Sequence, residues 1–396
     1  MQSRSMSTPL KSSPTVQSNR MAATGTLDTS TIAAKVQEGS RISAEDALFL
    51  FQHASPLELS ALATLRREQS APGRTISYIV GRILNYTNVC WVRCKFCAFY
   101  RVPNHAEGYV LSDDDILEKV GHTVATAYEL DRHLGVPEGT DRAESVEILF
   151  QGGLNPKLKL DYYEGIFRKI KERFPEVILH ALSPAEIIYI AHISKVTLDN
   201  CLVRLKDAGL HSIPGAGGEI LVDRVRSLIA PYKDTTEEWL ACMRTASKLG
   251  IRSTASMMFG HVETLEDRVE HLQRIRDLQD ECAPFRAFIT WSFQPEDTQL
   301  PIPHKASGWD YLRTLAVSRI FLDNIPNVQL SILTQGPKIA QLGLAYGAND
   351  FGSIMIEENV VSAAGNKFIL SASEFERLIR DAEYAPRRRN TRYELI

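Results

Sequence analysis

From Ile76 onward, short apolar segments of the sequence alternate with segments of amphipathic helical character. This alternation is typical of βαβ units, in which parallel strands form one sheet and helices cover it. Eight alternating units predict a closed (β/α)8 barrel of the TIM type, with its active site at the carboxyl ends of the strands. The expected strands are residues 79–87, 146–151, 177–182, 210–213, 251–257, 286–293, 328–333 and 353–356.

The barrel is expected to occupy residues 76–360 of the 396-residue chain. A barrel of this kind takes about 250 residues, so the length fits one barrel with terminal additions better than two equal domains. Leucine-rich helical patterning predicts an N-terminal helical extension over residues 31–75. Residues 361–396 are expected to form a C-terminal helix and a basic tail, in which the run Arg387–Arg389 is solvated.

The first segment, residues 1–30, is rich in Ser and Thr and has few large apolar side chains. Such a composition cannot bury enough apolar surface to fold, so we expect a disordered tail. The basic residues that precede Asp28 give it a weak transit-peptide character, but a flexible tail, or a true start at Met21 rather than Met1, is the preferred interpretation.

The composition excludes several classes of function. A net charge of -3 and a pI near 6.4 give no electrostatic reason to expect nucleic acid as a partner. No apolar run reaches the roughly 18 residues of a membrane span. Six cysteines in so long a chain do not form a disulfide framework, which predicts a protein of the reducing cytoplasm.

Seven of the expected strands end in Gly, polar or ionisable residues, as a barrel active site requires. The residues after strands one to seven are, in order, the cysteine loop 90–97, then 151–156, 180–184, 212–219, 257–263, 291–295 and 334–336. This recurrence is stronger evidence for a site than any one of these motifs.

The cysteine loop contains three thiols within eight residues, those of Cys90, Cys94 and Cys97. Cysteine thiolates bind iron–sulfur clusters, and three thiolates leave one iron of a [4Fe-4S] cube open to an outside ligand. A structural zinc site with His105 as the fourth ligand is the alternative, which would make the chain a non-radical barrel protein. Three ordinary buried cysteines fit less well, because the polar residues Asn88, Arg93 and Lys95 surround them, whereas buried cysteines usually have apolar neighbours.

The spacing C-x3-C-x-aromatic-C resembles the cluster loop of radical S-adenosylmethionine (SAM) enzymes, in which the open iron binds the amino and carboxylate groups of SAM. The resemblance implies two cofactors, a [4Fe-4S] cluster and SAM. It also implies that SAM contacts the loop, the glycine turn after strand two and later strand ends. The expected cofactor-binding residues are Phe96, Gly152, Gly153, Asn155, Ser183 and Glu219.

The motifs NYTNVC-x3-C-KFCAFYR, QGGLNP, SIPGAGGEIL, MMFGHVE and WSFQPEDT together resemble one group, the menaquinone (futalosine pathway) and deazaflavin radical SAM enzymes. The resemblance covers residues 81–365. Within the group, CAFYR and FQP are most similar to the enzymes that cyclise dehypoxanthine futalosine. The aminofutalosine enzymes and the second half of the deazaflavin enzymes are the close alternatives.

The resemblance implies an oxidative cyclisation. A flavodoxin or ferredoxin reduces the cluster, SAM is cleaved to methionine and a 5'-deoxyadenosyl radical, and this radical takes a ribose hydrogen from dehypoxanthine futalosine. The sugar radical then adds to the benzoate ring, which regains aromaticity by losing an electron and a proton. Glu219, His261 and Glu263 are the candidates for the general base, since all three are ionisable and follow barrel strands.

The side chains that bind the substrate carboxylate are a separate question. Arginine is suited to this role, because its planar guanidinium matches a carboxylate in two parallel hydrogen bonds. Arg101, Arg224 and Arg226 are candidates, although each is equally well explained as a surface ion-pair partner.

Overall fold

Eight parallel strands form the centre of the molecule. The structure is a computed structural model that describes residues 28–137, 139–140, 144–357, 359–365, 368 and 370–396. The strands are β1 (Thr75–Leu84), β2 (Val146–Phe150), β3 (Val177–Ala181), β4 (Leu210–Ile213), β5 (Arg252–Phe259), β6 (Phe285–Ser292), β7 (Asn327–Gln329) and β8 (Asp350–Met355).

The sheet closes on itself. Strands β2 to β8 pair in sequence order, β8 pairs with β1, and β1 pairs with β2, for instance Val80 opposite Val146. Every one of these pairings is parallel. The chain therefore forms the closed (β/α)8 barrel that the alternation of segments predicts.

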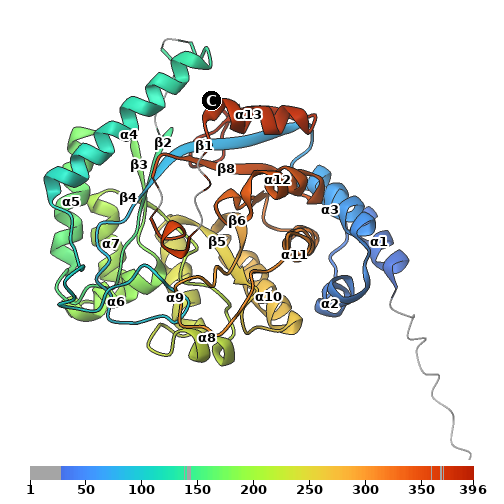
Figure 1. The fold of residues 1–396 in the computed structure, drawn as a ribbon, viewed down its shortest axis with the longest axis horizontal. Helices are drawn as coiled ribbons and strands as arrows, with labels where there is room; N and C mark the ends of the chain where they lie inside the picture. Colours follow the sequence, from blue (N-terminus) through green and yellow to red (C-terminus); the bar gives the residue numbers. More distant parts are fainter. Residues whose placement is uncertain (1–27, 138, 141–143, 358, 366–367, 369) are drawn as a thin grey trace, which may run out of the picture.

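Helices surround the barrel because each strand is followed by a segment with an apolar face (Figure 1). Ser112, Thr235 and Thr264 each accept a hydrogen bond from the third residue of the following helix, which forms a capping box at the start of that helix. The helices are α4 (Asp113–His133), α5 (Leu160–Arg173), α6 (Pro184–Ser194), α7 (Leu198–Ala208), α8 (Asp223–Ile229), α9 (Thr236–Lys248), α10 (Leu265–Cys282), α11 (Gly308–Phe321) and α12 (Ile332–Gly343).

The N-terminal extension comprises α1 (Thr29–Gln37), α2 (Ala44–His53) and α3 (Pro56–Ser70), beside α10 and α11 (Figure 1). Helix α1 begins within the segment expected to be a disordered tail, while residues 1–27 lie outside the described part of the chain. No helix in the described ranges is long and apolar enough to cross a membrane.

The seventh strand differs from the expected range. It ends at Gln329, and the apolar residues Ile332 and Leu333 begin helix α12 instead of completing the strand. Thr334–Gly336 accordingly lies inside that helix, which is kinked at Gly336. A short apolar run does not by itself distinguish a strand from a buried first helical turn, which explains the error.

The C-terminal segment corrects the expectation of a solvated basic tail. After helix α13 (Ala372–Asp381), residues Ala385–Arg388 form a ninth strand, β9, parallel to β1. β9 pairs with residues 75–78 of β1, before the stretch of β1 that pairs with β2. Arg387 is exposed, but Arg388 and Arg389 are buried.

Arg389 is fixed by an ion pair inside the barrel. Its guanidinium donates to both carboxylate oxygens of Asp350 on β8, at 2.5 and 3.2 Å. Asp350 is fully buried and also accepts from Ser77 on β1. From Arg389 the chain crosses the amino-terminal end of the barrel: Thr391 donates to Glu147 on β2, and Tyr393 to Gln329 on β7. Residues 389–393 thus form what we call the barrel floor.

Arg389→Gln should destabilise the protein strongly, because it leaves the Asp350 carboxylate buried without its cation. We expect a loss of about 3 kcal/mol in the free energy of unfolding, measured by urea denaturation. Arg387→Gln is the matched control in the same basic run and should change stability by less than about 0.5 kcal/mol. Equal effects of the two substitutions would contradict the buried ion pair.

Candidate active site

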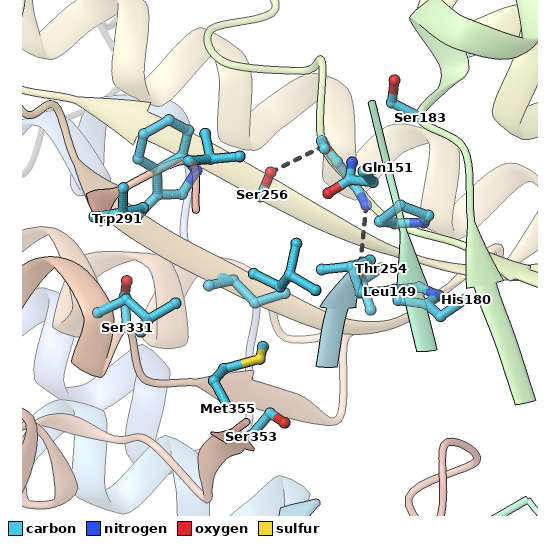
Figure 2. A pocket seen from close by; sticks show the side chains of 18 of the residues that line it. Leu149, Gln151, His180, Ser183, Thr254, Ser256, Trp291, Ser331, Ser353 and Met355 are labelled. Carbon is cyan, nitrogen blue, oxygen red and sulfur yellow. Dashed lines mark hydrogen bonds between the residues drawn. The ribbon is translucent and has the colours of Figure 1, made fainter. Parts of the chain in front are cut away.

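The barrel encloses a cavity of about 450 Å³ that runs from the cysteine loop to the barrel floor. Glu147 and Leu149 on β2 and Gln151 directly after it line the cavity at three alternate positions of the chain. At about 3.3 Å per residue, the outer two of these are about 13 Å apart along the strand. Figure 2 shows side chains from several strands facing this common space, among them Trp291 and Met355 opposite Gln151 and His180. A cavity of this size suits a small organic molecule.

The lumen has a polar and an apolar side. Strands β2 to β5 contribute most of the polar side, and β1, β6 and β8 most of the apolar side. The polar residues are Glu147, Gln151, His180, Ser212, Thr254 and Ser256, and the apolar ones are Ile79, Ile83, Ile289, Trp291, Phe351 and Met355. An elongated ligand with one polar flank and one apolar ring would match this division.

The three thiols of the cysteine loop face this cavity together, with Phe96 beside them. Backbone hydrogen bonds to distant segments hold the loop: Cys90 N–H donates to Arg101, and Lys95 N–H donates to Ile229. Among the described residues, no three His, Cys, Asp or Glu side chains converge on the position of a single ion. His105 instead accepts from the backbone of Glu107. His105 does not line the cavity with the three thiols.

Burial raises the pKa of the Cys94 and Cys97 thiols. A thiol in such a place ionises when it binds a metal centre, since the metal charge replaces the lost solvation. The donor set thus fits an iron–sulfur cluster held by Cys90, Cys94 and Cys97, with no fourth cysteine lining the cavity in the described ranges.

The glycine turn after β2 packs directly on the cysteine loop. A Cβ atom on Gly153 would lie 2.3 Å from the carbonyl oxygen of Val89 and 2.9 Å from Cys90 Cβ, and one on Gly152 would meet the Tyr86 ring at 2.8 Å. Both positions therefore require glycine. Their N–H groups are already bonded, to Glu186 and to Thr87. No described donor bonds their carbonyl groups, and both residues line the cavity.

Glu186 is a cavity residue that the sequence did not single out. It is buried and accepts from Gly152 N–H, Tyr86 O–H and Ser183. Burial raises the pKa of its carboxyl group. Ser183 lines the cavity as the N-cap of α6, whereas Asn155 is buried against Thr87 and does not line it. The only sequence signal for Glu186 was the capping box Ser183-x-x-Glu186.

Glu219 lies at the cavity wall in an ion pair with Lys233. The Lys233 Nζ atom is 2.6 Å from Glu219 Oε1 and 5.6 Å from the centroid of the Phe96 ring. Burial acts to lower the pKa of Lys233, but the charges of Glu219 and Cys94 outweigh it and raise that pKa. Glu219 has a positive φ of 38°, and its Oε2 atom is buried without a partner among the described residues. This oxygen is free to accept a hydrogen bond from a ligand in the cavity.

His261 and Glu263 lie elsewhere. Both side chains are buried and do not line the cavity. Glu263 accepts from the backbone of Gly260 and His261 and from Arg268, while His261 Nε2 lies 3.2 Å from the Met258 carbonyl. The structure thus brings Glu219 to the cavity with the thiols and leaves His261 and Glu263 in the network that starts α10.

The three arginines proposed for the substrate carboxylate each have a carboxylate partner already. Arg101 pairs with Glu107, Arg224 with Asp267 and Arg226 with Asp234. None of the three lines the cavity.

The comparisons with known proteins agree with this geometry. Residues 84–275 match the family described as Radical SAM superfamily. The crystal structure of methylornithine synthase (PylB) superposes with a TM-score of 0.67 at 15% identity, over 90% of this chain and 97% of that one. The chain belongs to the radical SAM superfamily, whose cluster and SAM the cysteine loop and the cavity are suited to bind.

The C-terminal part of the chain matches a more specific family within the superfamily. Residues 282–396 match the family described as CofH/MqnC C-terminal region, so the chain belongs to that branch of the superfamily. It is 44% identical to the cyclic dehypoxanthine futalosine synthase of Halalkalibacterium halodurans, over 92% of this chain and 94% of the relative. It is 38% identical to a 5-amino-6-(D-ribitylamino)uracil--L-tyrosine 4-hydroxyphenyl transferase of Methanococcoides burtonii, over 89% and 95%.

Gly153→Ala should lower the iron content of the reconstituted protein. The added methyl group cannot fit 2.3 Å from Val89 O, so the cysteine loop must shift. We expect less than about half of the wild-type iron and sulfide per chain, measured after anaerobic reconstitution. Gly165→Ala, which meets nothing within 4 Å on helix α5, is the control and should retain full iron content. Full iron in the Gly153 variant would contradict the packing argument.

Proposed function

We propose that this protein is a radical SAM enzyme that converts dehypoxanthine futalosine to cyclic dehypoxanthine futalosine in menaquinone biosynthesis. The observation that carries the proposal is the 44% identity to a cyclic dehypoxanthine futalosine synthase over 92% of the chain. The matched length includes nearly the whole barrel and so nearly every wall of the cavity.

The cofactor end of the cavity is the cysteine loop with the glycine turn. In the proposal, Cys90, Cys94 and Cys97 bind the cluster, and a flavodoxin or ferredoxin is the external electron donor. When bound, the cluster and SAM supply the 5'-deoxyadenosyl radical that starts the reaction. The carbonyl groups of Gly152 and Gly153 accept from the SAM ammonium group. Glu219 Oε2, which Lys233 orients through the other oxygen, accepts from a ribose hydroxyl.

The floor end of the lumen is covered, which helps to protect a radical inside it. A primary carbon radical abstracts hydrogen from any donor within reach, so such a site must exclude water and stray donors. The barrel floor closes the amino-terminal end through Arg389, Thr391 and Tyr393. Ile83, Ile289 and Trp291 give the reacting region an apolar wall that lacks reactive O–H and S–H groups.

His180 is our candidate for the general base in place of His261 and Glu263. Its side chain lines the lumen (Figure 2). Its Nδ1 atom lies 2.7 Å from Ser212 Oγ. Burial lowers its pKa, so the ring is neutral at pH 7 and able to accept a proton. Glu219 remains the alternative base, because it also lines the cavity.

A second candidate function rests on the 38% identity to the transferase relative. That relative's name implies two substrates, 5-amino-6-(D-ribitylamino)uracil and tyrosine. An aminofutalosine synthase is a third alternative within the same chemistry.

The assay that separates these functions uses the anaerobically reconstituted protein with SAM and reductant. With dehypoxanthine futalosine we expect free 5'-deoxyadenosine and a product lighter than the substrate by one molecule of hydrogen. Product from 5-amino-6-(D-ribitylamino)uracil with tyrosine would favour the transferase instead. Covalent attachment of the adenosyl group to product would favour an aminofutalosine synthase. Cys94→Ala is the control and should abolish 5'-deoxyadenosine formation in every case.

His180→Gln should separate radical formation from product formation. The glutamine keeps hydrogen-bonding capacity but cannot take up a proton, so cyclised product should fall about 100-fold. Formation of 5'-deoxyadenosine should stay within about threefold of wild type, since His180 does not touch the cysteine loop. Parallel loss of both products would instead indicate a role of His180 in binding.

A further inference from the structure

Arg286 lies where the lumen meets the barrel floor. It is the second residue of β6, and its side chain lines the cavity. Its Nη1 atom donates to the backbone carbonyl of Thr391 at 3.2 Å, and its own carbonyl accepts from Asn327. Backbone and side chain are thus both held, with the guanidinium at the end of the lumen opposite the thiols.

The cations that line the cavity differ in their partners. Lys233 is paired with Glu219 at 2.6 Å, and Arg389 with Asp350 at 2.5 Å. Arg286 has no ion pair with any carboxylate in the described part of the chain, and its one hydrogen-bond partner there is the neutral Thr391 carbonyl.

The charges around Arg286 do not neutralise it. Burial lowers the pKa of Arg286, the cations Arg252 and Arg392 lower it further, and the carboxylate of Glu144 acts to raise it. Glu144 is itself bound by Arg392. Glu147, at the same level of the lumen, accepts a hydrogen bond from Thr391, and its charge acts to raise the pKa of Arg389. Burying a guanidinium without a counter-charge costs free energy. An anionic ligand bound beside it would offset that cost.

We propose that Arg286 binds the carboxylate of the substrate at the barrel floor, an assignment that rests on the proposed function. The benzoate carboxylate of dehypoxanthine futalosine is the anion that fits. A guanidinium with one nitrogen held by the Thr391 carbonyl keeps others for a two-point contact with that carboxylate.

The length of the lumen supports this assignment. Glu147 on β2 and Gln151 just after the strand mark its lower and upper levels, about 13 Å apart. A benzoate anchored at the floor therefore extends its sugar end upward to the level of the cysteine loop. The ring then lies between Ile289 and Leu149, in the apolar middle of the cavity. The C-terminal segment takes part in recognition, because Thr391 orients the arginine.

The test compares the substrate with its carboxamide on the reconstituted holoenzyme with SAM and no reductant, so that nothing turns over. Binding is measured by calorimetry on wild type, Arg286→Gln, Arg286→Lys and Arg252→Gln. Arg252 is a neighbouring cation that does not line the cavity, which makes it the matched control. Wild type and the Arg252 variant should prefer the acid over the amide by about 10- to 100-fold.

Arg286→Gln should bind acid and amide about equally, and Arg286→Lys should keep part of the preference because it keeps the charge. An unchanged preference in Arg286→Gln would overturn the assignment while leaving the proposed function intact. If Arg286→Gln does not fold, as judged by thermal unfolding, a full preference in Arg286→Lys would overturn the two-point contact. Failure of wild type to bind the acid would overturn the proposed function and this assignment together.

Discussion

The buried ion pair between Arg389 and Asp350 fixes the end of the chain inside the barrel, and much of the site depends on that placement. Asp350 belongs to β8, while Arg389 directly follows β9, so the pair joins the last strand to the closed sheet. From this point the chain can only continue across the amino-terminal opening. Thr391 and Tyr393 then meet β2, β6 and β7 through hydrogen bonds. The barrel floor thereby covers the amino-terminal end of the lumen.

The barrel floor and the cysteine loop lie at opposite ends of the cavity, so its two ends differ in chemistry. Near the loop, the pair of Lys233 and Glu219 is internally neutral and leaves one carboxylate oxygen unsatisfied. Near the floor, Arg286 is a cation with an unsatisfied charge. In the proposed function, SAM takes the loop end and the substrate carboxylate takes the floor end. A substrate placed the other way round would set its carboxylate beside that of Glu219, where two like charges repel.

The sequence predicted the parts of this structure that local patterns determine. The alternation of segments predicted the barrel, and the spacing of Cys90, Cys94 and Cys97 predicted the cysteine loop at the cavity. It did not predict β9, because the run Arg387–Arg389 has the composition of a solvated tail and only pairing with β1 buries it. Arg286 and Glu186 were missed for a related reason. Each looks like an ordinary charged residue until the barrel closes and places Arg286 on β6 and Glu186 on α6 at the cavity wall.

The same limitation affected the candidate bases. His261 and Glu263 follow β5, as barrel active-site residues do, but strand position does not say which way a side chain points. Glu263 instead binds the backbone at Gly260 and the guanidinium of Arg268, so its charge stabilises the start of α10. His180 lies inside β3 and faces the lumen. In a barrel whose cavity reaches the floor, inward residues of the strands themselves are as close to a substrate as the loops above them. In the proposed function, the strands that line this deep lumen therefore recognise the substrate, and the loops bind the cofactor.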